Sequence, residues 1–159
     1  MNRKAFTLIE LLVVVAIIGI LAAVGVVAYN GYTSAAKKNT SKTNHAAVCK
    51  YISAEIKRCD LGEASIFDNN LNCSDLAVGN NSDRVARAAA KSLLNFAKNA
   101  YDTNNSAITL FHNNDVPGDI GIGKYSKQQI HVRTCWDSTC PAQTNANTKN
   151  VDQCIIDVE

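Results

Sequence analysis

A run of 24 residues, from Phe6 to Tyr29, constrains this chain of 159 residues more than any other feature. Twenty of the 24 residues are hydrophobic, and Glu10 is the only charged one. As an α-helix the run extends roughly 36 Å at about 1.5 Å per residue, which is enough to cross a hydrocarbon core of about 30 Å. Residues 30–159 contain only 52 hydrophobic residues in 130, so we expect a membrane-crossing helix followed by a soluble head.

The residues that flank this run predict its orientation. Arg3 and Lys4 precede it without any acidic residue, so the positive-inside rule keeps the N-terminus cytoplasmic and the head outside, although three lysines follow at 37, 38 and 42. A cleaved secretory signal, a plain membrane anchor and a buried core helix are the alternatives. A secretory apolar region is shorter, about 7 to 15 residues, and a buried helix of this length needs more partner surface than the head provides.

Glu10 distinguishes a plain anchor from a helix that assembles with others. An ionised carboxylate placed centrally in a membrane helix costs about 2.5 to 3.5 kcal/mol, and less near an interface. If the chain is cut after Ala5, the new amine of Phe6 can offset this cost, because two charges about 4 Å apart interact by roughly 4 kcal/mol at an effective dielectric of 20. Such a pair also defines the register between neighbouring helices.

The N-terminal motif carries a family resemblance. Arg3-Lys4-Ala5 followed by Phe6-Thr7-Leu8-Ile9-Glu10-Leu11 resembles the class III signal and mature start of type IV pilins, the subunits of retractile bacterial filaments. The resemblance continues through Gly19, Tyr29 and Tyr32 and covers about residues 2–38. The short leader is similar to that of the type IVa branch.

The resemblance implies specific processing and assembly. Prepilin peptidase would remove residues 1–5 by cutting between Ala5 and Phe6 and would methylate the new amine of Phe6. Glu10 would take the place of the family's acidic residue, which recruits the next subunit and neutralises a neighbouring Phe6 amine. Two departures are Ala5, where most prepilins have Gly, and Val27, where many type IVa pilins have Pro. Gly19 and Gly25 remain as weak points where we expect local melting of the helix in a filament.

The resemblance also implies partners and a location. The partners are other copies of the chain in a helical homopolymer, prepilin peptidase, the assembly platform with its ATPase, and membrane lipid before assembly. The pool would lie in the inner membrane and the assembled fimbrium outside the cell, where it serves adhesion, twitching motility or DNA uptake. The alternatives are the major pseudopilin of a type II secretion system and a minor pilin whose head binds DNA or a surface.

For the head, residues 30–159, the pattern predicts an α+β fold with the first helix packed on an antiparallel sheet. That helix continues to about residue 58, with Val48, Ile52, Ile56 and Cys59 in one buried stripe. Residues 59–106 form a loop region that holds a second helix from Ser82 or Asp83 to about Ala100. Strands are expected in the C-terminal region 107–159, over residues 107–111, 118–123, 129–136 and 153–158, with residues 131, 133 and 135 on a solvent-facing side.

Six cysteines in a head outside the cytoplasm indicate disulfides, and six cysteines allow 15 pairings. We expect Cys59 with Cys73, which closes the loop after the first helix. A pair Cys140 with Cys154 is similar to the disulfide-bounded C-terminal region of type IVa pilins, and Cys49 with Cys135 remains. Zinc held by Cys135, Cys140 and His131 is a weaker alternative, because the spacing lies outside the usual pattern.

No motif for catalysis, a cofactor or a metal is evident. The Gly118–Gly123 segment lacks the Lys and Ser/Thr of a phosphate loop, and His45, His112 and His131 are isolated. Residues 68–70 and 113–115 offer oxygen atoms for calcium, but turn chemistry explains them without a metal. Loss of Arg3 and Lys4 leaves 14 basic and 14 acidic residues, so nucleic-acid binding is not indicated, although three lysines lie near Tyr29 and Tyr32.

Overall fold

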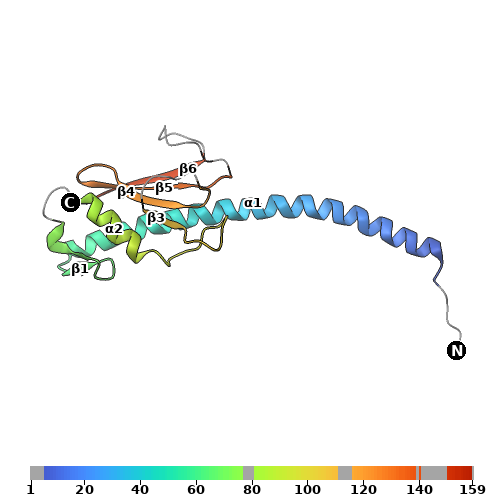
Figure 1. Ribbon diagram of the computed structural model, residues 1–159, viewed down its shortest axis with the longest axis horizontal. Helices are drawn as coiled ribbons and strands as arrows, with labels where there is room; N and C mark the ends of the chain where they lie inside the picture. The colour runs from blue at the N-terminus through green and yellow to red at the C-terminus, as the bar shows by residue number, and fades with distance from the viewer. Residues whose placement is uncertain (1–5, 77–80, 111–115, 139, 141–149, 159) are drawn as a thin grey trace, which may run out of the picture. The chain divides into compact units, whose positions relative to one another are not determined.

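The computed structural model describes residues 6–76, 81–110, 116–138, 140 and 150–158. Contacts divide the chain into two compact units, Met1–Ala36 and Lys37–Glu159, and one long helix runs from the first into the second. The elements in chain order are α1 (Leu8–Asp60), β1 (Ser65–Ile66), β2 (Leu71–Asn72), the 3-10 helix η1 (Cys73–Asp75), α2 (Ser82–Ser92), β3 (Ile108–Leu110), β4 (Ile120–Lys124), β5 (Gln129–Cys135) and β6 (Val151–Asp157) (Figure 1).

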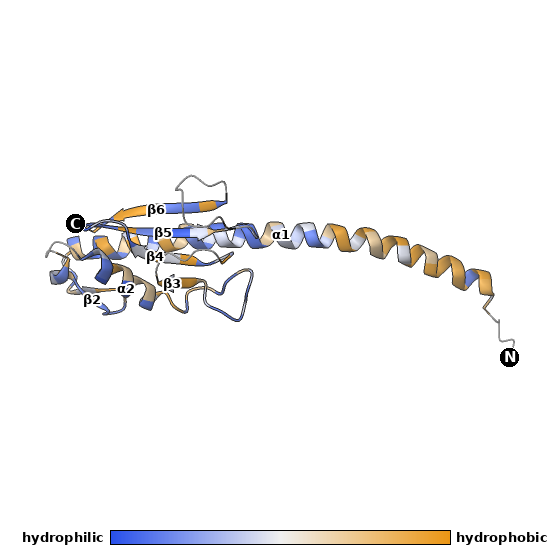
Figure 2. Cartoon of the chain, turned by 45° about the horizontal axis from the view of Figure 1, so that its top comes forward, coloured by the Kyte–Doolittle hydropathy of each residue, from blue (hydrophilic) through white to orange (hydrophobic). Residues whose placement is uncertain are grey.

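The first unit is the N-terminal portion of α1. Figure 2 shows that the hydrophobic residues of α1 concentrate in this portion. Every side chain from Phe6 to Tyr32 is exposed, and the large hydrophobic ones range from 49% exposed at Val13 to 83% at Leu8. Within the described part of the chain, α1 alone is long and apolar enough to cross a membrane.

In the second unit α1 buries one face against the head. The buried positions recur every three or four residues, which is the spacing of a helical stripe. Val48, Ile52 and Ile56 lie in it as predicted, and Cys59 is half-buried beside the core. The complete set is Ser41, His45, Val48, Ile52, Glu55 and Ile56.

The end of α1 at Asp60 has a clear local cause. Gly62 adopts a φ of +91°, its N–H donates to the carbonyl of Cys59, and the N–H of Glu63 donates to that of Arg58. These two bonds form a Schellman motif, in which the left-handed residue after a helix is usually glycine.

Strands β3 to β6 form one sheet in the order β3-β4-β5-β6. The β4–β5 and β5–β6 pairs are antiparallel, but β3 and β4 are parallel, with Ile108 opposite Ile120. The sheet is therefore antiparallel as predicted except at β3, whose parallel pairing with β4 makes it a mixed sheet. In this register Ile120, the first residue of β4, lies opposite Ile108, the first residue of β3, so both strands run in the same direction.

One face of the sheet is the core face. Ile122, Ile130 and Val132 are fully buried on it, and α2 packs against β3, β4 and β5 there. On the opposite face, which we expected to be wet, His131 is only 8% exposed and Cys135 is buried. The ring of Tyr125 lies edge-on to His131 at 5.4 Å, and Cys135 is bonded to Cys140, so neighbouring loop residues cover part of that face.

Helix α2 is shorter than predicted, because it ends at Ser92 rather than near Ala100. Its buried face includes Val85 and Ala89, whereas Phe96 is 46% exposed. Beyond this end, the fully buried side chain of Asn99 holds the chain in a non-helical conformation. Its amide accepts two backbone N–H groups and donates to Asp119 and to the Pro117 carbonyl, so this segment is held as a loop.

The segment between the helices, predicted as loop, contains the short antiparallel hairpin β1–β2. Its turn places Phe67, Asp68 and Asn69 at φ between 53° and 62°, the left-handed region that side chains other than glycine seldom adopt. Phe67 is nevertheless fully buried, and its N–H donates to Glu55 Oε2 of α1 at 2.6 Å. The buried carboxylate and the buried ring together hold this turn against α1.

Candidate functional site

Thr7 and Glu10 form a reciprocal pair at the start of α1. The N–H and hydroxyl of Thr7 donate to Glu10 Oε2 at 2.8 and 2.6 Å, and the N–H of Glu10 donates to Thr7 Oγ1 at 3.3 Å. This is a capping box, whose signature is Thr-x-x-Glu. The sequence contains this signature, and the structure adds the cap to the role that the charge of Glu10 predicts. Within the described residues, Glu10 Oε1 has no hydrogen bond and stays open to another partner.

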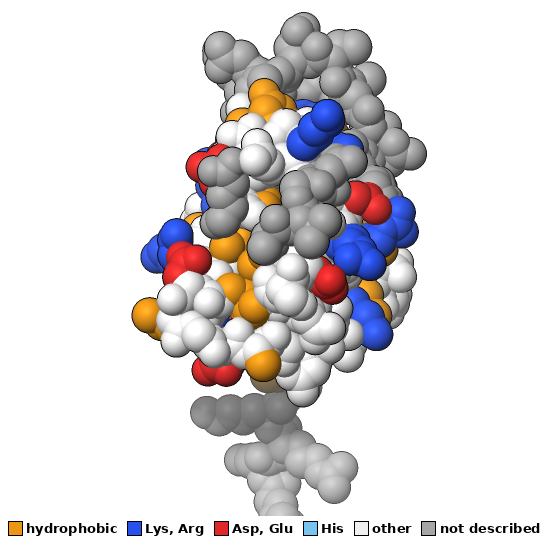
Figure 3. Space-filling model, turned by 90° about the vertical axis from the view of Figure 1, so that its left-hand side faces the viewer, with side chains coloured by type: hydrophobic (Ala, Val, Ile, Leu, Met, Phe, Trp, Pro, Cys, Tyr) orange, Lys and Arg blue, Asp and Glu red, His pale blue; other side chains and the backbone are white. Residues whose placement is uncertain are grey.

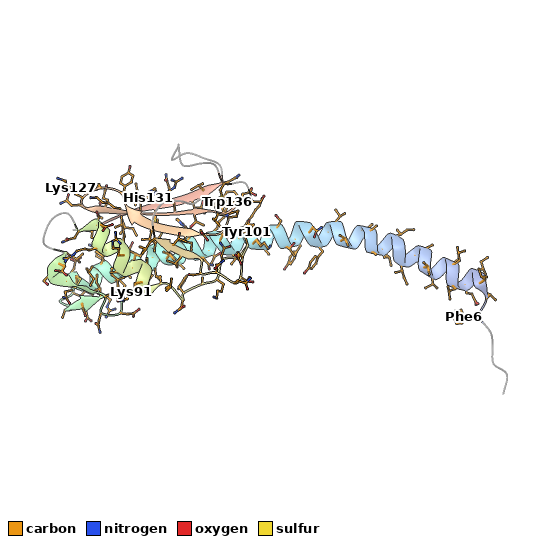
Figure 4. The ribbon with its side chains drawn as sticks, viewed as in Figure 1. Phe6, Lys91, Tyr101, Lys127, His131 and Trp136 are labelled. Carbon is orange, nitrogen blue, oxygen red and sulfur yellow. A yellow bond between two sulfur atoms is a disulfide. The ribbon has the colours of Figure 1, made fainter. Side chains whose placement is uncertain are left out.

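The other N-terminal residues singled out in the sequence are exposed wherever the structure describes them. Phe6 is 80% exposed just before α1 (Figure 4), and Ala5 lies outside the described residues. Helix α1 passes through Gly19 and Gly25 without a break, and a Cβ atom at either position would meet nothing within 4 Å. Melting at these glycines therefore stays a prediction about the assembled filament.

The three lysines that follow the apolar run contact the head. Lys38 Nζ lies 3.0 Å from Asp137 Oδ2, Lys42 Nζ lies 3.7 Å from the ring centroid of Trp136, and Lys37 Nζ lies 5.5 Å from that of Tyr101. Tyr101 also donates to the Trp136 carbonyl at 2.8 Å, and Figure 4 shows both rings beside α1. The lysine charge lowers the pKa of Asp137, mainly through the Lys38 hydrogen bond. These residues form a lysine collar, made of Lys37, Lys38, Lys42, Tyr101, Trp136 and Asp137.

The sequence places these lysines near Tyr29 and Tyr32 but does not predict their contacts with the head. Tyr29 and Tyr32 are 67% and 74% exposed. Figure 3 shows the end of the head away from these lysines, where both basic and acidic side chains lie at the surface.

All six cysteines form disulfides. Cys59 is bonded to Cys73, as expected. The other two pairings were wrong, because Cys49 is bonded to Cys154 and Cys135 to Cys140.

The strand register explains both corrections. Cys154 lies opposite Val132, which is on the core face, and so it reaches α1. Cys135 follows Thr134, whose side chain is on the core face, so the side chain of Cys135 is on the opposite face. Cys135 therefore cannot reach Cys49 of α1 and is bonded to Cys140. The zinc alternative has no support among the described residues, because the ligand atoms of His131, Cys135 and Cys140 do not come together in one cluster.

His45 is buried between α1 and the sheet. Its Nδ1 lies 3.0 Å from Thr134 Oγ1, and its Nε2 lies 3.5 Å from Cys49 Sγ. Burial lowers the pKa of His45, and the charge of Asp152 opposes this shift. His131 lies on the other face of the sheet, so the two histidines do not share a site; His112 lies outside the described residues.

The oxygen-rich segments behave as turns where they are described. The Asn69 amide oxygen accepts from Ser65 Oγ, and the Asn70 amide donates to the Phe67 carbonyl, so both serve the β1–β2 turn. The second candidate segment, residues 113–115, lies outside the described residues.

The fold and the N-terminus together define a class of protein. It is an α+β protein with one long N-terminal helix, apolar in its first half and packed on a small mixed sheet in its second, as in the type IV pilin fold. The family model described as the prokaryotic N-terminal methylation motif matches residues 1–26. This motif is the class III signal of type IV pilins, and it points to a structural protein. No solved structure matches the chain.

Proposed function

We propose that this protein is a type IV pilin, a subunit that polymerises into a bacterial surface filament through its apolar helix. The observation that carries the proposal is the exposure of that helix: every side chain from Phe6 to Tyr32 is exposed in the single chain. Lipid covers this surface before assembly, and other copies of the same helix cover it in the filament.

Processing precedes assembly in this proposal. Prepilin peptidase cuts between Ala5 and Phe6 and methylates the Phe6 amine, and the matched motif at residues 1–26 supports this step. The processed chain waits in the inner membrane until the assembly platform and its ATPase add it to the fimbrium. Gly19 and Gly25 then allow the helix to melt locally.

Glu10 specifies the register between helices. Exchange of lipid for protein contacts yields little hydrophobic free energy, so packing and polar pairs must direct assembly. The capping box occupies Oε2 of Glu10, which leaves Oε1 for the Phe6 amine of a neighbouring copy. The carboxylate of Glu10 thereby caps its own helix and positions the helix of the neighbouring copy.

Two observations favour a pilus subunit over the alternatives. Three disulfides stabilise the head, whereas the heads of major pseudopilins are usually poor in cysteine. A DNA-binding minor pilin has less support, because the lysine collar already holds Lys37, Lys38 and Lys42 against the head. Shearing of cells distinguishes a pilus subunit from a major pseudopilin, because long filaments are released from the surface of piliated cells and short periplasmic filaments are not.

Three variants test the role of Glu10. Glu10→Gln removes the charge but keeps an oxygen that can accept from Thr7, whereas Glu10→Ala removes both. Thr7→Val removes the cap, at about 1 kcal/mol of helix stability, but keeps the charge. We expect sheared filaments to be lost in both Glu10 variants and largely retained in Thr7→Val.

Membrane levels and disulfide content of each variant, measured by immunoblot with and without reductant, show whether the subunit still folds. Normal filaments from Glu10→Gln would remove the register argument. The absence of surface filaments from the unaltered chain in a piliated host would overturn the proposed function itself.

A further inference from the structure

Three side chains with metal-binding atoms meet between α1 and the sheet. They are His45 and Cys49 of α1 and Cys154 of β6, and their nitrogen and sulfur atoms all lie within 4.8 Å of one another. The spacing of four residues places His45 and Cys49 on one face of α1, and the β5–β6 register places Cys154 on the core face. Among the described residues this is the one such group of three or more.

The histidine is oriented toward the sulfur atoms. Its Nδ1 contacts Thr134 Oγ1 at 3.0 Å, and its Nε2 faces Cys49 Sγ at 3.5 Å. In the tautomer protonated at Nδ1, this nitrogen donates to Thr134 and Nε2 directs its lone pair at the cysteine. Metal-binding histidines are typically held in this way, with the second ring nitrogen bonded to a neighbouring oxygen.

We propose that, when Cys49 and Cys154 are thiols, these two residues and His45 bind a thiophilic divalent cation such as Zn²⁺. Zinc bonds of about 2.3 Å to sulfur and 2.0 Å to nitrogen place the two atoms about 3.5 Å apart in a tetrahedral site. The observed separation of Nε2 and Cys49 Sγ is 3.5 Å. The two sulfur atoms, bonded to each other in this structure, lie about 3.8 Å apart when both bind the cation, and water completes the fourth position.

The cation and the disulfide are then alternative cross-links between α1 and β6. Oxidation of the two bound thiolates forms the Cys49–Cys154 bond and releases two electrons. A small-molecule disulfide such as oxidised glutathione accepts these electrons with two protons from solvent and becomes two thiols. The sulfur atoms lose the negative charge that holds the cation, so the ion is released as the disulfide forms.

Cobalt titration of the full chain in detergent micelles tests the proposal. Serine replaces Cys59, Cys73, Cys135 and Cys140, and the remaining pair is reduced with a phosphine, which avoids adding a competing thiol. We expect one Co²⁺ per chain, with the visible bands of a tetrahedral ion and thiolate-to-cobalt charge transfer, and displacement of Co²⁺ by Zn²⁺.

Substitutions around the site separate binding by this trio from adventitious thiolate binding. His45→Gln should weaken Co²⁺ binding at least tenfold, and Thr134→Val should weaken it by about 10- to 100-fold by releasing the imidazole. His131→Gln, a histidine on the other face of the same sheet, is the matched control and should leave the affinity unchanged. An affinity equal in His45→Gln and in the control, or no tetrahedral Co²⁺ at all, would overturn the proposal.

A second measurement does not depend on folding of the variant with four serine substitutions. The wild-type full chain is reduced completely and loaded with ¹¹³Cd²⁺, and its NMR signal reports the number of sulfur ligands. Cys49→Ser should remove the signal of a site with two sulfurs and one nitrogen, while Cys59→Ser should leave it in place. A signal that survives Cys49→Ser places the cation elsewhere and contradicts the assignment.

Discussion

The two portions of α1 belong to one continuous helix but meet opposite surroundings. The portion up to Ala36 is almost entirely exposed, and the portion from Lys37 to Asp60 buries a stripe against the head. Among the described residues the first portion keeps its apolar side chains exposed, whereas the second packs against partners in the same chain. The helix therefore joins an exposed apolar segment to a packed core, and changes in the two portions should affect different measurements.

The largest effect is expected from removal of the Cys49–Cys154 bond, which joins α1 to β6 across 105 residues. The double variant Cys49→Ser/Cys154→Ser should lose about 4 kcal/mol of unfolding free energy, because a long loop is no longer closed in the unfolded chain. Urea unfolding of the head, followed by near-UV circular dichroism, measures the loss. Removal of the Cys135–Cys140 bond, which closes a short loop, is the comparison and should cost about 2 kcal/mol of unfolding free energy. Equal losses for the two bonds would contradict the loop-length argument.

The next effect concerns Glu55, which is only 7% exposed and accepts from the N–H of Phe67. Glu55→Ala leaves this buried N–H without a partner and should cost about 2 to 3 kcal/mol in urea unfolding. Glu63 contacts the same guanidinium of Arg58 at the surface, so Glu63→Ala is the matched control and should cost less than about 1 kcal/mol. A large loss of unfolding free energy in Glu63→Ala would show that Glu55 stabilises the fold through its ion pair with Arg58 and not through the turn at Phe67.

A smaller effect is expected at Gly118, which has a φ of +84°. A Cβ atom there would lie 2.3 Å from Asn99 Oδ1, so Gly118→Ala combines an unfavourable φ with displacement of the buried amide. The expected loss is about 2 kcal/mol. Gly62→Ala shares the positive φ but has nothing within 4 Å, so thermal unfolding of this variant isolates the backbone cost of about 1 kcal/mol.

The smallest effect tests the lysine collar, where the two portions of α1 meet. Lys42→Ala removes the contact with Trp136 and should cost about 0.5 to 1 kcal/mol in thermal unfolding. Lys50→Ala, at an exposed position of the same helix, should cost almost nothing. If the two variants are equally stable, the collar does not anchor the helix to the head.

Local patterns predicted much of this structure. Alternating residues located β5 and β6 closely, and the stripe at Val48, Ile52 and Ile56 located the buried face of α1. The spacing of Thr7 and Glu10 also indicates the capping box that these two residues form.

The remaining features depend on which distant segments meet. The partners of the lysines, Trp136 and Tyr101, come from loops that no periodicity describes, and the segment after α2 is held by a bond from Asn99 to the distant Asp119. The pairing of Cys49 with Cys154 required the strand register, because a shift of one residue would turn Cys154 to the other face. The parallel pairing of β3 with β4 likewise depends on how these two strands meet, which no local pattern describes.

The proposed function places the head outside the cell, and there the Cys49–Cys154 bond has a further consequence. A protease that cuts the backbone once at any point between these cysteines produces two fragments that stay covalently joined. Nicked subunits therefore keep their connection to α1, and fragments separate only after a reductant is added. Surface segments of the head can be damaged by secreted proteases without the loss of the subunit to which they belong.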